Sequence, residues 1–269
     1  MITSNPSGDR IYETLRVEFA DRTVRIWLDR PDVRNAFNIQ LVREMREAVA
    51  AAGKDDDVRA VVVSGSGTSF CAGADLNWMR EIIAQSYEQN LKESLELSAC
   101  LYELYALRKP TIARVNGPAV GGGVGFLSAC DIVIASTAAR FGLSEVKIGL
   151  VPAAISPYVV RRIGESRARR YFLTGERFDA RRAEDIGLVS LVAEPDQLDA
   201  AVDSCLALLL TSGPEALVKV KELLRTVPGM SFDEARLFTA EMIAGLRVSP
   251  EAQEGMAAFL EKRKPRWSA

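Results

Sequence analysis

The sequence predicts an α/β fold in which short buried strands lead through glycine-rich turns into helices. The apolar run Thr111–Val115 precedes the glycine-rich stretch Asn116–Asp131, and a second apolar run covers residues 132–135. This order is typical of a strand, a turn, a short helix and a strand. The buried run Val58–Val63 leads in the same way into the small-residue loop Gly65–Leu76, which opens onto a helix.

The C-terminal part is predicted to be entirely helical. Helical segments follow Pro195 and are broken at Gly213-Pro214, Pro228-Gly229 and Ser249-Pro250, because proline and glycine end helices. The strand-containing and helical parts therefore separate near residue 195. We predict a core of residues 1–195 and a helical region of residues 196–269.

The remaining elements follow from periodicity and turn residues. Alternating runs at 15–19 and 24–28 predict a hairpin, and Asn38 is a plausible N-cap for a helix that stops at Gly53. A long helix is predicted over Tyr87–Leu107. We expect its leucines to face mainly inward: Leu91, Leu95, Leu97, Leu101 and Leu104. An irregular loop, 140–152, precedes helices at 153–164, 166–174 and 178–187 and a last strand at 188–192.

Composition excludes several classes of function. The 269 residues are 48% hydrophobic and 26% charged, with a net charge of −2, so no field favours nucleic acid or an anionic membrane. Residues 1–12 show no targeting pattern, and the longest apolar runs fall far short of a membrane span. The four cysteines form no C-x-x-C pair, which suits reduced thiols in a cytoplasm: Cys71, Cys100, Cys130 and Cys205.

The chain contains no histidine. Ser-His-Asp hydrolysis, histidine-bearing zinc sites and imidazole bases are therefore excluded, and we expect no metal site. Acid or base chemistry near neutral pH then points to a carboxylate whose pKa is shifted by its surroundings. Glu145 lies among apolar neighbours in the predicted loop, although an ion pair with Lys147 or an arginine would also account for it.

The two glycine turns suggest how the protein receives an oxyanion. Gly121, Gly122, Gly123 and Gly125 let the backbone approach a ligand, and a helix that starts there directs its first unbonded N–H groups toward it. Neither turn fits G-x-G-x-x-G or the P-loop pattern. Two adjacent turns can present one N–H each to a single carbonyl oxygen; the alternative is a tight contact between packed elements.

Two further patterns are weaker. Ser144–Lys147 matches S-x-x-K, but its companion motifs S-D-N and K-T-G are absent and the segment does not look helical. The segment 166–174 is basic at Arg167, Arg169 and Arg170. An RNA-binding face is conceivable there, but no aromatic stacking platform accompanies it, so a solvated or phosphate-facing helix is expected.

Successive motifs resemble the enoyl-CoA hydratase/isomerase (crotonase) family over nearly the whole chain. They are Arg30-Pro31 with Arg34-Asn35-Ala36-Phe37-Asn38, Phe70 to Leu76, Asn116-Gly117 with Gly121-Gly122-Gly123, Cys130-Asp131, and Gly255-Met256 with Phe259 and Glu261-Lys262-Arg263-Lys264. The resemblance implies a spiral of ββα units in two roughly perpendicular sheets. It also implies a C-terminal helical trimerisation region, hence a homotrimer or a dimer of trimers.

The resemblance also implies site residues. The backbone N–H groups of Ala74 and Gly122 would form an oxyanion hole for an acyl thioester, and each such donor stabilises a developing enolate by on the order of 3 kcal/mol. Glu145 would be the acid/base. Coenzyme A, as part of the substrate and with no separate cofactor, would contact Val33, Arg34, Ala36, Ala72, Asp75, Leu76, Phe259 and Lys262.

The sequence departs from the family in one place. Family hydratases usually carry a second glutamate where this chain has Gly125, so Glu145 is left as the single acid/base, as in several family isomerases. The run 141–158, with 169–174 and 74–79, is similar to bacterial methylglutaconyl-CoA hydratases. This implies interconversion of 3-methylglutaconyl-CoA and 3-hydroxy-3-methylglutaryl-CoA in leucine and isovalerate metabolism, with Arg80, Lys147 and Tyr158 as candidates for holding the distal carboxylate.

Three other functions compete with this one. An enoyl-CoA isomerase would use Glu145 to move a proton between C2 and C4 without adding water. A non-catalytic, RNA-binding relative would use the basic helix, against which the charge balance counts. A thioester hydrolase would need a second group to steer water to the carbonyl carbon, and the sequence offers no obvious one.

Overall fold

The computed structural model describes residues 12–268, so all but the last residue of the N-terminal stretch predicted to lack a targeting segment lies outside the described residues. The chain divides into two compact units. The first comprises Met1–Leu107 and Thr111–Val202, and the second comprises Arg108–Pro110 and Asp203–Ala269. Each unit is described separately below.

A six-stranded sheet forms the centre of the first unit. Its strands, in spatial order, are β1 (Leu15–Ala20), β2 (Thr23–Leu28), β3 (Ala60–Gly65), β4 (Thr111–Val115), β6 (Ile132–Ser136) and β9 (Leu191–Ala193). β1 and β2 form the predicted antiparallel hairpin, and all other pairings are parallel. The hairpin turn places Asp21 and Arg22 at positive φ, the backbone twist that suits a two-residue turn. The predicted strand–turn–helix order is confirmed.

A second, three-stranded sheet contains β5 (Ala119–Val120), β7 (Arg140–Gly142) and β8 (Arg177–Asp179). Two expectations are wrong here. The segment at Arg140 is a strand rather than part of an irregular loop, and Phe178 lies in a strand rather than a helix, opposite Phe141. Such short strands show no alternation to reveal them. Helix α7 (Ala180–Asp185) begins after Asp179, whose carboxylate caps it.

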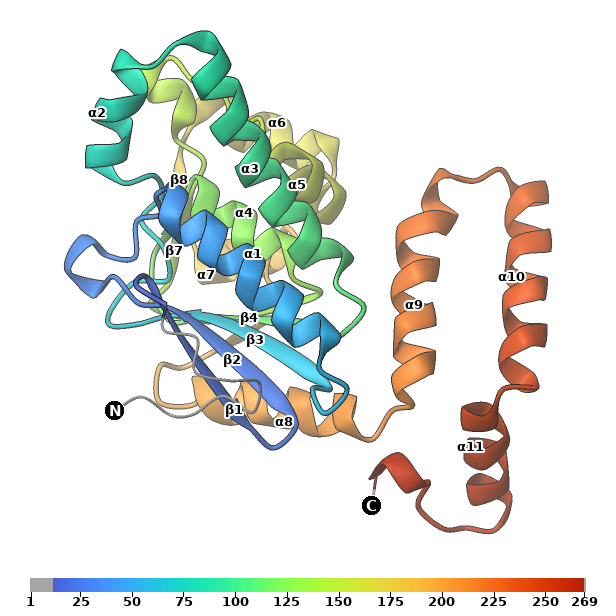
Figure 1. Cartoon of the computed structure of the whole chain (residues 1–269). Coiled ribbons are helices and arrows are strands. Elements are labelled where there is room, and N and C mark those ends of the chain that lie inside the picture. Colours follow the sequence, from blue (N-terminus) through green and yellow to red (C-terminus); the bar gives the residue numbers. More distant parts are fainter. Residues whose placement is uncertain (1–11, 269) are drawn as a thin grey trace. The chain divides into compact units, whose positions relative to one another are not determined.

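Helices cover the sheets of the first unit. They are α1 (Ile39–Lys54), α2 (Leu76–Ala84), α3 (Tyr87–Ala106), α4 (Gly122–Ala129), α5 (Ser156–Ile163) and α6 (Glu165–Thr174). Asn38 caps α1 as predicted, accepting from the N–H of Leu41 at 3.0 Å. α1 and α3 lie side by side (Figure 1). On α3, Leu101 and Leu104 are buried, whereas Leu91 and Leu95 are exposed, contrary to expectation.

The second unit is helical. The boundary at Val202 falls inside α8 (Leu198–Leu210), which is followed by α9 (Pro214–Thr226), a 3₁₀ turn (Val227–Gly229), α10 (Phe232–Arg247) and α11 (Pro250–Leu260). The helix breaks occur where the proline and glycine pairs predict them. Between residues 12 and 268 no single helix is long and apolar enough to cross a membrane, and only the bent pair of α8 and α9 passes that test by length and composition.

Candidate active site

The glycine turn before α4 is shaped by close contacts. Gly121 has a φ of 54°, a conformation that favours glycine. A Cβ at Gly122 would lie 2.4 Å from the ring of Phe37, and one at Gly123 would lie 2.6 Å from the carbonyl oxygen of Cys71. Neither position has room for a side chain, so the start of α4 approaches its neighbours as bare backbone.

This turn leaves one backbone donor unused. Gly122 is the first residue of α4, and the first N–H groups of a helix have no acceptor within it. Within residues 12–268 the N–H of Gly122 also has no acceptor outside the helix. The positive end of the helix dipole lies at the same place. An oxygen atom of a ligand placed here meets a ready donor.

A second unused donor lies in the loop before α2. The residues on either side of Ala74 are paired with Phe37: the Phe37 N–H donates to Gly73 at 2.8 Å, and Asp75 donates to the Phe37 carbonyl at 2.9 Å. The N–H of Ala74 itself donates no hydrogen bond in the described part of the chain. The turn is fixed by its neighbours while this one group stays available.

Phe37 connects the two turns. Its backbone brackets Ala74, and its ring packs on Gly122. The loops are also paired directly, because Cys71 forms a bridge with Ala119 and its carbonyl accepts from the N–H of Val120 at 2.9 Å. The structure therefore brings together the two turns that the sequence places far apart. That their N–H groups share one oxyanion stays a prediction.

Glu145 lies beside the first glycine turn. It begins a short 3₁₀ helix, Glu145–Ile148, and its Oε1 would be 3.1 Å from a Cβ at Gly121. Its Oε2 is buried and has no hydrogen-bond partner in the described chain. Burial raises the pKa of the Glu145 carboxyl above its ordinary value, because removal from water disfavours the charged form.

The ion pair that would have explained Glu145 is absent from residues 12–268. Lys147 is exposed, and its aliphatic stem packs near Gly175, whose Cβ position is 3.1 Å from the Lys147 Cε. No salt bridge joins Glu145 to an arginine or lysine in that range. A carboxylate that is partly desolvated, unpaired and beside the turn that carries the unused N–H of Gly122 fits the role of a general acid/base.

The residues predicted to contact coenzyme A in the first unit fall into two groups. Val33, Arg34 and Leu76 are exposed, with 70% of Leu76 accessible. Ala36 is buried, Ala72 is half-buried, and the N–H of Ala72 donates to the carbonyl of Arg34 at 3.0 Å. Val33, Arg34 and Ala36 precede α1, while Ala72 and Leu76 lie on either side of Ala74 in the chain. Their contact with a ligand stays a prediction.

Asp75 is the exception in this set, because its carboxylate is already engaged. It is 4% exposed, pairs with Arg30 at 2.7 Å, and accepts from the N–H of Asn77 at 2.7 Å as the cap of α2. Burial acts to raise its pKa, but these bonds hold the pKa below its ordinary value. The side chain of Asp75 therefore stabilises the turn that carries Ala74.

Comparisons with known proteins place this geometry in context. Residues 18–269 match the family described as enoyl-CoA hydratase/isomerase. The chain belongs to the enoyl-CoA hydratase/isomerase family. A Thermus thermophilus protein that carries a provisional enoyl-CoA hydratase name is 37% identical over 242 residues, which cover 90% of this chain and 96% of that protein.

Solved structures agree with this family membership. An enoyl-CoA hydratase from Shewanella pealeana is 40% identical, with a TM-score of 0.92 over 95% of this chain and 96% of that one. An enoyl-CoA hydratase/isomerase from Marinobacter aquaeolei is 35% identical, with a TM-score of 0.91 over 96% of this chain and 100% of that one. The predicted crotonase-like α/β fold is confirmed, and the findings support an enoyl-CoA hydratase-type activity.

For this family member, the position of the usual second glutamate is closed. A Cβ at Gly125 would lie 2.2 Å from Cγ2 of Ile155 and 3.6 Å from Leu101. Ile155 is 3% exposed and precedes α5, which packs on α4. An apolar side chain therefore fills the space into which a side chain at residue 125 would project. Sequence reasoning found Gly125 but had no signal for Ile155.

Asn35 is a second residue that sequence reasoning did not single out for a role. It is fully buried at a φ of 57°, which asparagine tolerates better than most residues. Its Nδ2 donates to the carbonyls of Ser66 and Ser69 at 2.8 Å each, and its Oδ1 accepts from the N–H of Arg30 at 2.9 Å. Asn35 ties the loop before α1 to the loop that carries Ala74.

The other predicted residues belong to both units and are described in turn. Phe259 and Lys262 belong to the second unit, where Phe259 is 83% exposed and Lys262 follows α11 at a φ of 56°. Among the three acyl-pocket candidates, Arg80 is exposed and donates to Asn77 at 2.6 Å. Tyr158 is buried, and its ring centroid lies 5.4 Å from that of Tyr105 on α3. Within residues 12–268 no group of three acidic, cysteine or histidine side chains could hold a metal ion.

Proposed function

We propose that this family member interconverts 3-methylglutaconyl-CoA and 3-hydroxy-3-methylglutaryl-CoA. The observation that carries the catalytic part is the buried, unpaired Oε2 of Glu145 beside the turn of Gly121. The choice of acyl group is supported by the similarity of residues 141–158 to methylglutaconyl-CoA hydratases. The family membership supports a coenzyme A thioester as substrate.

The proposed mechanism uses two backbone donors and one carboxylate. The thioester oxygen accepts hydrogen bonds from the N–H groups of Ala74 and Gly122, which stabilise negative charge as it develops there. Glu145 takes a proton from a water molecule, and the hydroxide oxygen bonds to C3 while the C2–C3 π electrons move toward the thioester. The resulting enolate is held by the two donors.

Glu145 then completes the reaction alone. Its carboxyl returns the proton to C2, so that the elements of one water molecule are added and the carboxylate is regenerated. Ile155 fills the space beside Gly125 where the family's other carboxylate would project. A carboxyl group with a raised pKa is suited to both transfers. It accepts a proton more readily than an ordinary carboxylate, and near neutral pH it can still give the proton up.

The distal carboxylate of the substrate requires a cationic or hydroxyl partner in the acyl pocket. We propose Arg80, Lys147 or Tyr158 for this contact. Arg80 and Lys147 are each replaced by alanine, and Tyr158 by phenylalanine. The variant that loses its preference for carboxylated over uncharged acyl chains identifies the partner residue. If all three variants keep that preference, the assignment is wrong.

The proposed assembly is a homotrimer or a dimer of trimers in a cytoplasmic setting. The second unit exposes large apolar side chains on its helices, which favours their burial against other copies: Leu224, Phe232, Leu237, Val248, Phe259 and Leu260. The four cysteines are all free, which suits a reducing compartment. Sedimentation of the purified protein would test the oligomeric state.

An enoyl-CoA isomerase is the main alternative, favoured by the single carboxylate. The RNA-binding alternative loses support, because Arg169 pairs with Glu165 and Arg170 with Glu176 on the predicted basic helix. A phosphate backbone would have to compete with these carboxylates for both arginines.

One assay separates the hydratase from the isomerase. Purified protein is incubated in ¹⁸O-labelled water with 3-methylglutaconyl-CoA, 3-hydroxy-3-methylglutaryl-CoA, crotonyl-CoA or a 3-enoyl-CoA. Rapid interconversion of the first pair with uptake of labelled oxygen, lost in Glu145→Gln, is expected. A double-bond shift without label would identify an isomerase and contradict the proposal.

A further inference from the structure

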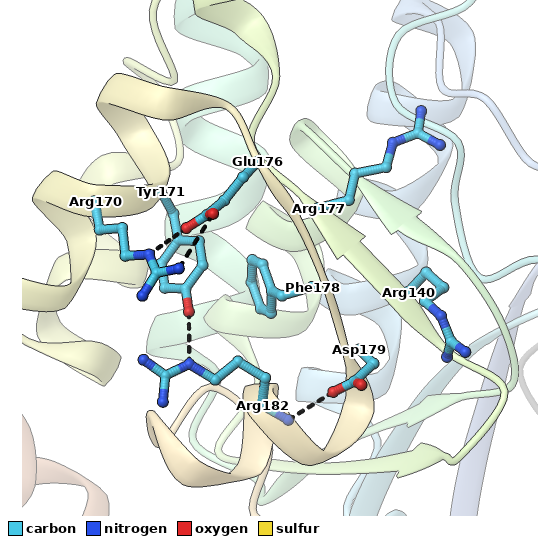
Figure 2. Close-up of a pocket in the computed structure, with 8 residues that line it drawn as sticks. All are labelled: Arg140, Arg170, Tyr171, Glu176, Arg177, Phe178, Asp179 and Arg182. Atoms are coloured by element: carbon cyan, nitrogen blue, oxygen red, sulfur yellow. Dashed lines mark hydrogen bonds and ion pairs between the residues drawn. The ribbon is translucent and has the colours of Figure 1, made fainter.

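A cavity of about 530 Å³ lies in the first unit and contains none of the residues discussed above as catalytic or coenzyme A-binding. It is formed by α6, β8, α7 and the start of β7 (Figure 2). We call it the arginine cavity, after four of its eight lining residues: Arg140, Arg170, Tyr171, Glu176, Arg177, Phe178, Asp179 and Arg182.

The charges of the arginine cavity do not balance. Four arginines face two carboxylates, and both carboxylates are occupied. Glu176 pairs with Arg170, with an Nη2 to Oε2 distance of 3.2 Å. Asp179 accepts from the backbone N–H of Arg182 at 2.8 Å, as the cap of α7. The cavity therefore carries a surplus of positive charge.

Three guanidinium groups make up this surplus. Arg140 donates through Nη1 to the carbonyls of Ala139 at 2.8 Å and Thr137 at 3.1 Å. Arg177 lies in β8, and its guanidinium has no hydrogen-bond partner within residues 12–268. Arg182 uses only Nε, which donates to the hydroxyl of Tyr171 at 2.9 Å. None of the three has a carboxylate partner in that range.

The floor of the cavity is formed by packed aromatic rings. Tyr171 is 1% exposed, and its ring lies 4.2 Å from the ring of Phe178, centroid to centroid. Phe178 stacks in turn on Phe141 at 5.7 Å. Because the rings are buried against one another, they offer no free face on which a base could stack. The Tyr171 hydroxyl instead holds the guanidinium of Arg182 in place.

We propose that the arginine cavity binds a diphosphate group. Guanidinium groups present paired N–H donors that match phosphate oxygens, and arginine is preferred wherever such planar recognition matters. Figure 2 shows Arg170 and Arg182 on one side of Phe178 and Arg140 and Arg177 on the other. A diphosphate carries more negative charge and more acceptor oxygens than a single phosphate, which suits several arginines without carboxylate partners, whereas the lack of a stacking platform disfavours a nucleic acid strand.

The proposal does not depend on the proposed catalytic function. The cavity nevertheless lies close in space to the segment that carries Glu145. The segment that leads from α6 into β8 packs on the 3₁₀ helix of Glu145, since Gly175 contacts Val146 and Lys147. β7, which begins with Arg140, also holds the glycine turn, because the carbonyl of Gly142 accepts from Gly121 at 2.8 Å.

The test is calorimetric titration of the full-length protein with inorganic phosphate, pyrophosphate and ADP at matched ionic strength. Saturable binding of pyrophosphate, tighter than that of phosphate, is expected. Arg177→Gln should weaken it at least about tenfold, and this variant breaks no side-chain bond that the structure records. Arg169→Gln is the matched control, because Arg169 lies on α6 but pairs with Glu165 and does not line the cavity.

The arms of the titration also identify the source of the group. If pyrophosphate and ADP bind equally, the diphosphate alone is recognised; if ADP binds more tightly, a nucleoside contributes. The proposal is overturned if no anion saturates at millimolar concentration, or if both variants weaken binding to the same extent. It is also overturned if Arg177→Gln changes only the sedimentation of the protein, which would mark an interface between copies.

Discussion

The carboxylate of Glu145 lies against the backbone of Gly121, so closely that a Cβ on that glycine would be 3.1 Å from Oε1. Gly121 also has a φ of 54° and a ψ of −122°, a conformation that other residues rarely adopt. The absence of a side chain at Gly121 therefore leaves room for the Glu145 carboxylate, whose buried Oε2 has no hydrogen-bond partner in the described chain.

Glu145→Gln should lower kcat by roughly 10²–10⁴-fold, the usual contribution of a positioned acid/base. The amide keeps the shape of the side chain but cannot accept and return a proton. Steady-state kinetics with the best substrate, together with the affinity for a non-reactive acyl-CoA analogue, checks this. Unchanged affinity with lost turnover is expected; loss of both in equal measure would point to a binding role instead.

The pH dependence of activity should reflect the raised pKa of Glu145. Because the ionised form accepts the proton from water, kcat/KM for hydration should rise with pH through a midpoint above the ordinary glutamate value of 4.5. A midpoint at or below that value would contradict the desolvated environment. The measurement is a pH–rate profile at constant ionic strength.

The raised pKa of Glu145 also affects how the unfolding free energy depends on pH. The dependence has the opposite sign to that of a salt-bridged carboxylate, whose pKa is lowered. Between the unfolded and folded pKa values, the native state binds more protons, so the stabilising contribution is present at low pH and is lost as pH rises through the folded pKa. The difference in unfolding free energy between wild type and Glu145→Gln should change in this window. A difference that does not vary with pH would contradict the shift.

Gly125→Ala should lower the unfolding free energy by about 1–3 kcal/mol, since the new methyl group would overlap Ile155. Adding Ile155→Ala should recover part of the loss relative to the sum of the single changes, because the two sites are in contact. Gly245→Ala on α10 is the control. No atom lies within 4 Å of its Cβ position, so alanine should stabilise by up to about 1 kcal/mol. Urea denaturation of the wild type, the two single variants, the double variant and Gly245→Ala measures these differences.

Asp75→Ala should cost about 2–4 kcal/mol of stability, because it removes the cap of α2 and leaves Arg30 without its carboxylate partner. Asp75→Asn keeps an oxygen for the cap and should cost less. Since the pKa of Asp75 is lowered, its contribution is present above the unfolded pKa and lost as pH falls through the folded one. Equal stability of the two variants at neutral pH would contradict this division of roles.

Local patterns predicted the parts of the site that depend on local structure. The glycine cluster before a short helix indicated a turn with free N–H groups, the family resemblance singled out Gly122 within it, and the breaks at Pro214 and Pro250 followed from proline chemistry. Glu145 stood out as a charged residue among apolar neighbours. These signals depend on residues adjacent in the sequence, which is why the turns and helix ends could be predicted, while the roles of Gly122 and Glu145 stay predictions.

Features formed by distant residues could not be predicted in this way. Nothing in the sequence indicates that the ring of Phe37 touches Gly122, or that Ile155 packs on Gly125. Likewise, the antiparallel pairing of β7 and β8 places Arg140 opposite Asp179, but strands of three residues carry no periodicity. The arginine cavity depends on that pairing and so remained hidden.

The contact between Ile155 and residue 125 limits how this enzyme could change. A substitution that introduces a carboxylate at 125 meets an occupied space, and one that shrinks Ile155 first leaves a hole in a buried region. Each first step is destabilising by itself, so the route from one acidic group to two requires paired changes. The chemistry available to descendants of this chain is therefore constrained by a single methyl group in its interior.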